Sequence, residues 1–223
     1  MRERLWRVRA QQVVLAQGAF ERPLVFCNND RPGVMLASAV SAYINRYGVC
    51  PGERAVVFTN NDSAYQTALD LKKAGRTVLI VDSRPGGARL VADAVSEAGI
   101  PILQGHVVTD VSGSSAVTCA HVAQWNGDAG ELVQSAISID CDLIAMSGGW
   151  SPAVHLHSQS GGKNAWDPQR HCFVPGAATQ ECMSAGAGNG KWSLADCLED
   201  GRDVGNEVVA RCGLAVATIE PPA

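Results

Sequence analysis

Residues 54–82 carry the pattern that most constrains how this chain can fold. The runs RAVVF at 54–58 and TVLIVD at 77–82 are almost wholly apolar, which predicts two strands buried on both faces. Between them, SAYQTALDLKKAG at 63–75 has apolar residues at helical spacing and ends on a glycine. Strand, helix and strand within about 30 residues predict a βαβ unit with parallel strands and a right-handed crossover.

The loop of this unit lacks the glycines of a dinucleotide-binding site. In the G-x-G-x-x-G fingerprint, the first glycine permits a tight turn, the second lets the backbone approach the pyrophosphate, and the third lets helix pack on strand. Those positions fall on Thr59, Asn61 and Ala64, of which only alanine is an accepted substitute. We expect the Asn61 side chain to fill the space that a phosphate needs, which makes the unit a retained scaffold.

Two carboxylates beside this loop support opposite conclusions about nucleotide binding. Asp82 ends the second strand, where a carboxylate would bind a ribose hydroxyl, although such residues are also common as simple caps. The predicted helix N-terminus at Ser63 is electropositive, but Asp62 competes for the position of an anion.

Two further turns are candidates for cofactor contact. LAQG at 15–18 ends a predicted strand over 11–16. GAGNG at 186–190 follows a predicted strand and is expected to open a long helix, with its N–H groups facing an anion. The candidate cofactor-binding residues are Ala16, Gln17, Gly18, Ala19, Gly186, Gly188, Asn189 and Gly190.

The remaining pattern gives an α/β protein with an inner and an outer part. We predict strands at 5–9 and 100–105, helices at 34–47 and 88–99, an antiparallel meander over 106–141 and a buried strand after it. The segment 151–180 is loop-rich, and the helix after 190 should turn Leu194, Leu198 and Val208 inward. The expected organisation is a Rossmann-like three-layer domain over 49–147 inserted in an incomplete outer dinucleotide-binding domain, formed by 1–48 and 148–223.

Composition excludes several classes of function. The net charge is -4 and no dense run of Lys or Arg occurs, so neither a nucleic acid nor an anionic membrane is an expected partner. No apolar stretch reaches the length of about 18 residues that a membrane span needs. Eight cysteines occur without a C-x-x-C pair, which favours mostly buried, reduced thiols and a cytoplasmic protein.

No residue is expected to act as a catalytic acid, base or nucleophile. His155 and His157 have no obvious third partner, so we expect ordinary loop histidines and no metal site. Ser147, in MSGGW, lacks the G-x-S-x-G elbow of a hydrolase.

Three stretches resemble the α subunit of heterotetrameric sarcosine oxidase. They are QVVLAQGAFERPLVFCNNDRPGVMLASAVSAYINRYGVCPGERAVVFTNNDSAY, SGGWSPAVHLHSQSGG and SAGAGNGKWSLADCLEDG. The resemblance covers nearly all of residues 5–213, and it makes the Asn-Asn-Asp loop a feature of the family. It also places the fold among flavoprotein reductases with two dinucleotide-binding domains.

The resemblance implies a role in oxidative demethylation of sarcosine to glycine. The one-carbon unit would pass to tetrahydrofolate or leave as formaldehyde, and oxygen would be reduced to hydrogen peroxide. The family's α subunit binds NAD, FAD and FMN belong to the β subunit or its boundary, and γ and δ subunits complete the complex. Family α chains are longer and begin with a glycine-rich motif that this sequence does not contain, and nothing here resembles their folate-binding domain.

The departure from the family pattern sets the expected role. Without the N-terminal motif, residues 15–19 and 186–190 would supply only the returning half of an NAD pocket, and Gln17 stands where the flavoprotein pattern usually has threonine. We expect a structural, cofactor-supporting part that is inactive alone. Two alternatives stay open: an NAD(P)H-dependent flavin reductase that uses the 55–82 unit, and a non-enzymatic module that binds other subunits.

Overall fold

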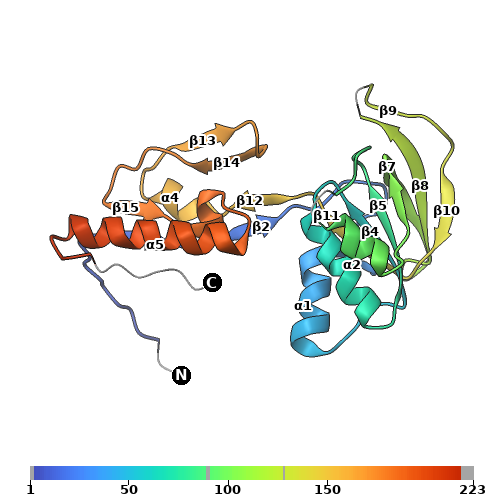
Figure 1. Ribbon diagram of the computed structural model, residues 1–223, viewed down its shortest axis with the longest axis horizontal. Helices are drawn as coiled ribbons and strands as arrows, with labels where there is room; N and C mark the ends of the chain where they lie inside the picture. The colour runs from blue at the N-terminus through green and yellow to red at the C-terminus, as the bar shows by residue number, and fades with distance from the viewer. Residues whose placement is uncertain (1–2, 89–90, 128, 217–223) are drawn as a thin grey trace. The chain divides into compact units, whose positions relative to one another are not determined.

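A computed structural model describes residues 3–88, 91–127 and 129–216 (Figure 1). The chain divides into two compact units. The first, called here the outer unit, comprises residues 1–20 and 150–223, and the second, the inner unit, comprises Glu21–Gly149. Each is considered by itself.

The inner unit is built on a parallel sheet of five strands. Their order across the sheet is β3 (Val34–Leu36), β11 (Leu143–Ser147), β4 (Arg54–Thr59), β5 (Thr77–Asp82) and β6 (Ile102–Gln104). β4 pairs with β5 from Arg54 opposite Thr77 to Thr59 opposite Asp82. The predicted βαβ unit is therefore present, and all five strands have their carboxyl ends at one edge.

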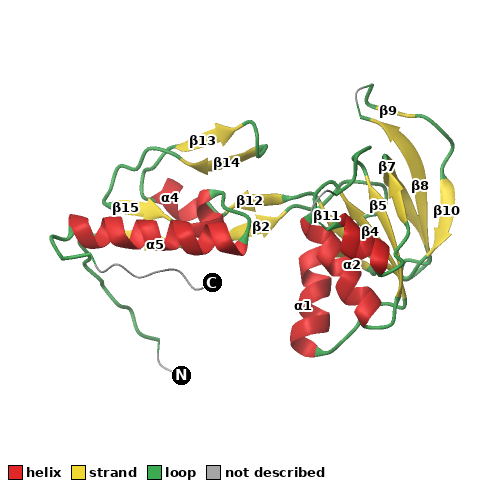
Figure 2. Cartoon of the chain, viewed as in Figure 1, coloured by secondary structure: helices red, strands yellow, loops and turns green. Residues whose placement is uncertain are grey.

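Different layers cover the two faces of this sheet, as Figure 2 shows. Helices α1 (Ala37–Tyr47), α2 (Ser63–Lys73) and α3 (Ala92–Glu97) pack on one face. The other face packs against an antiparallel sheet of β7 (His106–Ser112), β8 (Cys119–Asn126), β9 (Glu131–Leu132) and β10 (Ile137–Asp140). Alternation along β4 supplies both cores, because Ala55 and Val57 face the helices while Val56 and Phe58 face the meander. The predicted Rossmann-like three-layer fold is confirmed.

The first strand of the inner unit corrects the predicted start of a helix. Residues 34–36 form β3 and pair with β11, and α1 begins only at Ala37. The helix ends as predicted at Gly48, whose φ of 67° is in the left-handed region. Since β3 and α1 pack within the inner unit, the boundary in the structure lies at 20/21, whereas the sequence placed it at 48/49.

The outer unit contains short strands in pairs. β1 (Val13–Leu15) runs parallel to β15 (Cys182–Ser184), and β2 (Ala19–Glu21) pairs with β12 (Trp150–Pro152). β13 (Asn164–Asp167) and β14 (Cys172–Pro175) form a hairpin. The helical elements are α4 (His155–Gln159), the 3-10 turn η1 (Gly186–Asn189) and α5 (Leu194–Arg211).

Several expectations for the outer unit are wrong. Residues 5–9 form no strand, and the segment 151–180 holds β12, α4, β13 and β14. Leu194 and Leu198 on α5 are 76% and 42% exposed rather than inward.

The eight cysteines, all among the described residues, form no disulfide, and only Cys141 and Cys172 are buried, so the expectation of mostly buried thiols is wrong. None of the helices in the described part of the chain combines the length and the apolar character that a membrane span requires.

Candidate functional site

The loop after β4 is held by the Asn61 side chain. Its Nδ2 donates to the carbonyl oxygen of Ser147, at 3.1 Å, and to the Ser147 hydroxyl, at 3.0 Å. Its Oδ1 accepts from the backbone N–H of Ser63, at 3.1 Å, and from the Ser63 hydroxyl, at 2.6 Å. The Asn61 amide thus joins the carboxyl ends of β4 and β11 and also occupies the N-terminus of α2.

This position is where open α/β sheets bind ligands. From β4 the chain adds β5 and β6 on one side, whereas β11 lies on the other side, so the strand order reverses between β4 and β11. Ligands of such folds bind in the crevice at this reversal. A diphosphate there needs the free N–H groups of the helix N-terminus. In this chain the first N–H group of α2 already has an acceptor from the protein.

The N-terminus of α1, at the same edge of the sheet, also has an acceptor from the protein. Glu21, 9% exposed, accepts from the Ser38 N–H group at 2.9 Å and from the Ser38 hydroxyl at 2.6 Å. Ser38 lies in the first turn of α1. A carboxylate supplied by the protein therefore occupies the second position at which an anion would be favoured.

Asp82, the carboxylate that could bind a ribose hydroxyl, is also hydrogen-bonded within the protein. Asp82 is fully buried and accepts hydrogen bonds from the Tyr65 hydroxyl, at 2.8 Å, and from Arg84, at 2.8 and 3.1 Å. Arg84 also binds Asp62 at 2.7 Å. Burial raises the pKa of Tyr65 to about 12, and the hydrogen bond to Asp82 adds to the effect.

Arg84 is the residue of this site that the sequence analysis missed. It forms salt bridges with both Asp62 of the loop and Asp82 of β5, and so neutralises the two carboxylates. The signal was available, because two aspartates at the ends of adjacent elements require a cation when one of them is buried. The inner unit thus fills its own phosphate and ribose positions with side chains.

In the outer unit the two candidate turns lie side by side. A Cβ placed on Gly188 would lie 3.5 Å from the Gly18 carbonyl oxygen and 3.6 Å from its nitrogen. Leu15 links the turns further, since its carbonyl accepts from the Ala185 N–H group at 2.9 Å. The structure therefore brings residues 16–19 and 186–190 together, as their shared position after β1 and β15 requires.

Gln17 is tied into this turn by one end of its amide. Its Nε2 donates to the Ala153 carbonyl at 2.5 Å. Its Oε1 is buried without a hydrogen-bond partner among the described residues. Gly18 has a φ of 80°, which explains why a residue with a side chain is disfavoured at that point of the turn.

The glycine-rich turn does not meet its predicted geometry in full. It forms η1 and does not open α5, which begins at Leu194 with the Ser193 hydroxyl accepting from the Asp196 N–H group at 3.0 Å. The Gly186 N–H group donates to the Asp200 carboxylate at 2.8 Å, and the Asn189 amide lies 3.3 Å from it. The expectation that this turn presents its N–H groups to an external anion is wrong for Gly186.

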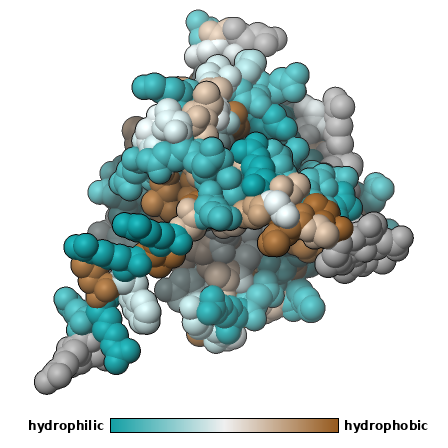
Figure 3. Space-filling view, turned by 90° about the vertical axis from the view of Figure 1, so that its left-hand side faces the viewer, coloured by the Kyte–Doolittle hydropathy of each residue, from teal (hydrophilic) through white to brown (hydrophobic). Residues whose placement is uncertain are grey.

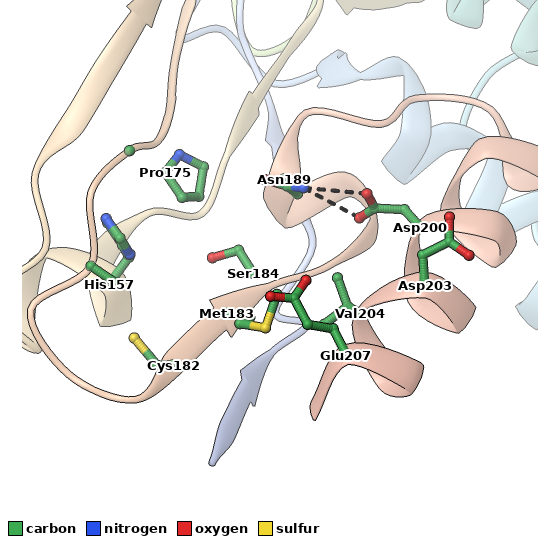
Figure 4. Close-up of a pocket in the computed structure, with 12 residues that line it drawn as sticks. His157, Pro175, Cys182, Met183, Ser184, Asn189, Asp200, Asp203, Val204 and Glu207 are labelled. Atoms are coloured by element: carbon green, nitrogen blue, oxygen red, sulfur yellow. Dashed lines mark hydrogen bonds between the residues drawn. The ribbon is translucent and has the colours of Figure 1, made fainter. Parts of the chain in front are cut away.

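A cavity of about 410 Å³ adjoins this turn in the outer unit (Figure 4). Helix α5 contributes its acidic side, including Asp200 and Glu207, and η1 contributes Asn189. In Figure 4 the Glu207 carboxylate lies toward Ser184 on β15. The acidic lining would repel a diphosphate, so this cavity does not suit a dinucleotide.

His155 and His157 each contact other parts of the protein and not each other. His157 is 2% exposed within α4, and its Nε2 lies 3.2 Å from the Lys163 carbonyl, while His155 contacts the Phe20 ring edge-on. Both lie in a helix and not in a loop. Over the described ranges, no group of three or more His, Cys, Asp or Glu side chains is placed to hold a metal ion.

No protein-family model matches the chain. Sequence relatives named sarcosine oxidase subunit alpha do match it. The protein from Corynebacterium sp. (strain P-1) is 44% identical over 213 residues, which are 95% of this chain and 22% of that protein. The protein from Rhizobium meliloti (strain 1021) is 40% identical over 220 residues, 95% of this chain and 20% of that protein.

Solved structures with the same fold include a dehydrogenase and a reductase. L-proline dehydrogenase from P. horikoshii matches 93% of this chain and 36% of its own, with a TM-score of 0.64 and 22% identity. Thioredoxin reductase from T. acidophilum matches 86% of this chain and 62% of its own, with a TM-score of 0.65 and 18% identity. These likenesses establish the FAD/NAD(P)-binding type of fold.

The chain spans about a fifth of the length of the curated relatives it matches. Over almost its whole length, this chain is related to the alpha subunit of sarcosine oxidase.

Proposed function

We propose that this chain is a supporting, non-catalytic part of a sarcosine oxidase alpha subunit. Its inner unit serves as architecture, and its outer unit contributes one side of an NAD pocket through residues 16–19 and 186–190. The observation that supports the proposal is the carboxyl edge of the inner sheet, where the Asn61 amide bonds to Ser147 and Ser63 and Arg84 pairs with Asp82.

The outer unit fits the cofactor role through its backbone. The two turns approach each other at Gly18 and Gly188, so they present adjacent main chain at the ends of parallel strands β1 and β15. NAD, when bound, would supply a hydride acceptor. Because Asp200 takes the Gly186 N–H group, the diphosphate would have to be bound by another polypeptide segment that carries a glycine-rich motif.

The complete activity belongs to the complex in this proposal. Sarcosine would be oxidised to glycine on the β subunit, which with its boundary holds FAD and FMN, and oxygen would be reduced to hydrogen peroxide. Tetrahydrofolate would accept the one-carbon unit, and γ and δ subunits would complete a cytoplasmic heterotetramer. This chain would supply none of the reacting groups.

The test compares two glycines within a full-length subunit. This chain would replace the matched part of the Corynebacterium sp. (strain P-1) subunit, and NAD affinity would be measured by calorimetry. Gly188→Val should weaken NAD binding at least tenfold, about 1.4 kcal/mol, because the new side chain enters the space between the turns. The control is Gly201→Val, at a position on α5 where a Cβ meets nothing within 4 Å.

Equal affinities of the two variants would refute the NAD role of the turns. Binding of NAD to the isolated 223-residue chain with micromolar affinity would instead favour a reductase that uses the 55–82 unit directly.

A further inference from the structure

A row of polar side chains crosses the outward face of the antiparallel sheet in the inner unit. His121 on β8 lies opposite Asp110 on β7 and opposite Ser138 on β10 in the strand register. Ser112 follows Asp110 by two residues and therefore lies on the same face. Val111, which stands between them, belongs to the buried core. Three adjacent strands, labelled in Figure 1, thus bring four polar side chains together.

The His121 ring bridges two hydroxyl groups of this row. Its Nε2 lies 2.6 Å from the Ser112 hydroxyl, and its Nδ1 lies 3.2 Å from the Ser138 hydroxyl. Because the Ser138 oxygen can accept from Nδ1–H, the tautomer protonated at Nδ1 leaves Nε2 to accept from Ser112. A hydroxyl, a base within hydrogen-bonding distance and a third group that orients the base form the arrangement that activates a serine nucleophile.

Asp110 places a negative charge beside this ring. Its carboxylate accepts from the Asn28 side-chain amide at 2.7 Å and from the Val111 N–H group at 2.7 Å. Asn28 has a φ of 60°, in the left-handed region that residues with side chains seldom adopt. The hydrogen bond from Asn28 is the main cause that lowers the pKa of Asp110, so this carboxyl is ionised at neutral pH. The strand register thus sets a fixed anion next to the histidine.

The turn after Ser112 presents main-chain N–H groups. Gly113 has a φ of 141°, and a Cβ there would lie 1.8 Å from the Ala116 carbonyl oxygen, so only glycine allows this turn. The Arg31 guanidinium donates to the Gly113 carbonyl oxygen and holds the turn. Among the described residues, the N–H groups of 113–115 have no hydrogen-bond acceptor. In α/β-hydrolases, the N–H group directly after the nucleophile is one that binds the oxyanion.

We propose that Ser112 is an acylation site, at which the inner unit accepts an acyl group from a small activated ester or thioester. The Ser112 oxygen forms a bond to the acyl carbon, and the bond from that carbon to the leaving oxygen or sulfur breaks. His121 Nε2 takes the hydroxyl proton and passes it to the leaving group. The Gly113 N–H group binds the oxyanion, and the Asp110 charge lies beside the protonated ring.

The burial of the site suits a small acyl donor. Ser112 and His121 are half-buried and Ser138 is exposed, so a small molecule reaches the hydroxyl without any rearrangement of the sheet. This activity uses no residue of the proposed NAD pocket and is independent of the proposed function.

Reaction of the 223-residue chain with p-nitrophenyl acetate tests the proposal. Release of p-nitrophenolate gives the rate, the intact mass gives the number of acetyl groups, and peptide mapping locates them. Ser112 should be acetylated at least about a hundredfold faster than Ser115, an exposed serine of the adjoining turn that has no histidine partner among the described residues.

Peptide mapping is essential because exposed apolar surface can hold an aryl ester without activating it. Figure 3 shows hydrophobic residues among hydrophilic ones on one face of the molecule. Trp166 and Phe173 of the β13–β14 hairpin are 53% and 54% exposed. A label spread over lysines and other serines would be an adventitious reaction and would count against the proposal.

Two variants separate activation of the serine from its mere exposure. His121→Gln keeps a side chain that can hydrogen-bond to the hydroxyls but cannot take up a proton, so acetylation of Ser112 should fall at least about a hundredfold. Ser112→Ala should lose the label altogether. Ser115→Ala is the matched control and should leave the rate unchanged, and circular dichroism checks that each variant is folded.

Two results would overturn the proposal. One is equal acetylation of Ser112 and Ser115, and the other is an unchanged rate at Ser112 in a folded His121→Gln variant. Either would reduce the row to ordinary cross-strand hydrogen bonds. The reaction is run without NAD, so its failure would leave the proposed function as it stands.

Discussion

The side-chain amide of Asn61 donates hydrogen bonds to both oxygen atoms of Ser147, at 3.0 and 3.1 Å. Ser147 is fully buried at the carboxyl end of β11. These bonds cross the point where a dinucleotide-binding sheet leaves a crevice for its ligand. A residue that replaces a fingerprint glycine has therefore become a structural tie between two strands and a helix.

Removing this tie should destabilise the inner unit. Asn61→Ala loses the bonds to Ser147 and leaves the first N–H group of α2 without its acceptor, so we expect a loss of about 1 to 2 kcal/mol in the free energy of unfolding. The matched control is Asn60→Ala at the adjacent exposed position, which should cost clearly less. Urea unfolding followed by circular dichroism gives both values. Equal costs would show that the Asn61 bonds contribute nothing specific.

Arg84 should matter more than any surface cation of the inner unit. Arg84→Ala leaves Asp82 buried with only the Tyr65 hydroxyl as side-chain partner, and we expect about 2 to 3 kcal/mol of destabilisation. The control is Arg76→Ala, which removes a salt bridge to Glu53, a residue that is 71% exposed, and should have a much smaller effect. If both variants unfold at the same urea concentration, Arg84 does not neutralise a buried carboxylate.

The strongest sequence predictions were those that depend on local pattern. β4, α2 and β5 follow from apolar runs and helical spacing, and the left-handed end of α1 at Gly48 follows from its glycine. Asn61 stands out in the sequence because the fingerprint defines what should stand there. In these cases the residues that decide the structure are close together in the chain.

Predictions failed where distant contacts decide the structure. The apolar run at 34–36 suits a helix or a strand, and only pairing with β11, more than 100 residues later, makes it β3. The strand pattern at 5–9 finds no neighbour among the described residues. Asp200 reaches back from α5 to Gly186, a contact that nothing in the glycine-rich turn itself indicates.

Asp200 should control the order of the glycine-rich turn. Asp200→Ala removes the acceptor of the Gly186 N–H group, so that amide should exchange faster and the outer unit should lose about 1 to 2 kcal/mol of stability. Asp203→Ala, on the same helix and lining the same cavity, is the control. Unchanged exchange at Gly186 in the Asp200 variant would contradict this assignment.

Tyr65 should make the inner unit sensitive to alkali. Its pKa is raised from 10.0 to about 12 in the folded protein, chiefly by burial, so the proton is held more tightly there than in the unfolded chain. The resulting stability is complete below pH 10 and is lost as the pH approaches 12, by about 2 kcal/mol. Tyr65→Phe should lack this loss. Parallel stability curves for the two proteins over that range would contradict the prediction.

Thiol reactivity should follow burial. Cys27 is exposed and should react first with an alkylating reagent. Cys141 is 1% exposed, and burial raises the pKa of its thiol to about 12, so it should react only after unfolding. Mass spectrometry of peptides after timed alkylation resolves the order. Early modification of Cys141 would show that the core between β4 and the meander opens readily.

The central claim is that the inner unit cannot bind a dinucleotide because its own side chains occupy the anion and ribose positions. The most direct test is an NMR titration of the isotope-labelled 223-residue chain with NAD and NADH, read at individual backbone amides. The account predicts that the signals of Asn60, Asn61, Ser63 and Arg84 do not move up to millimolar cofactor. Saturable shifts of those four amides, weakened in an Arg84→Ala variant, would contradict it.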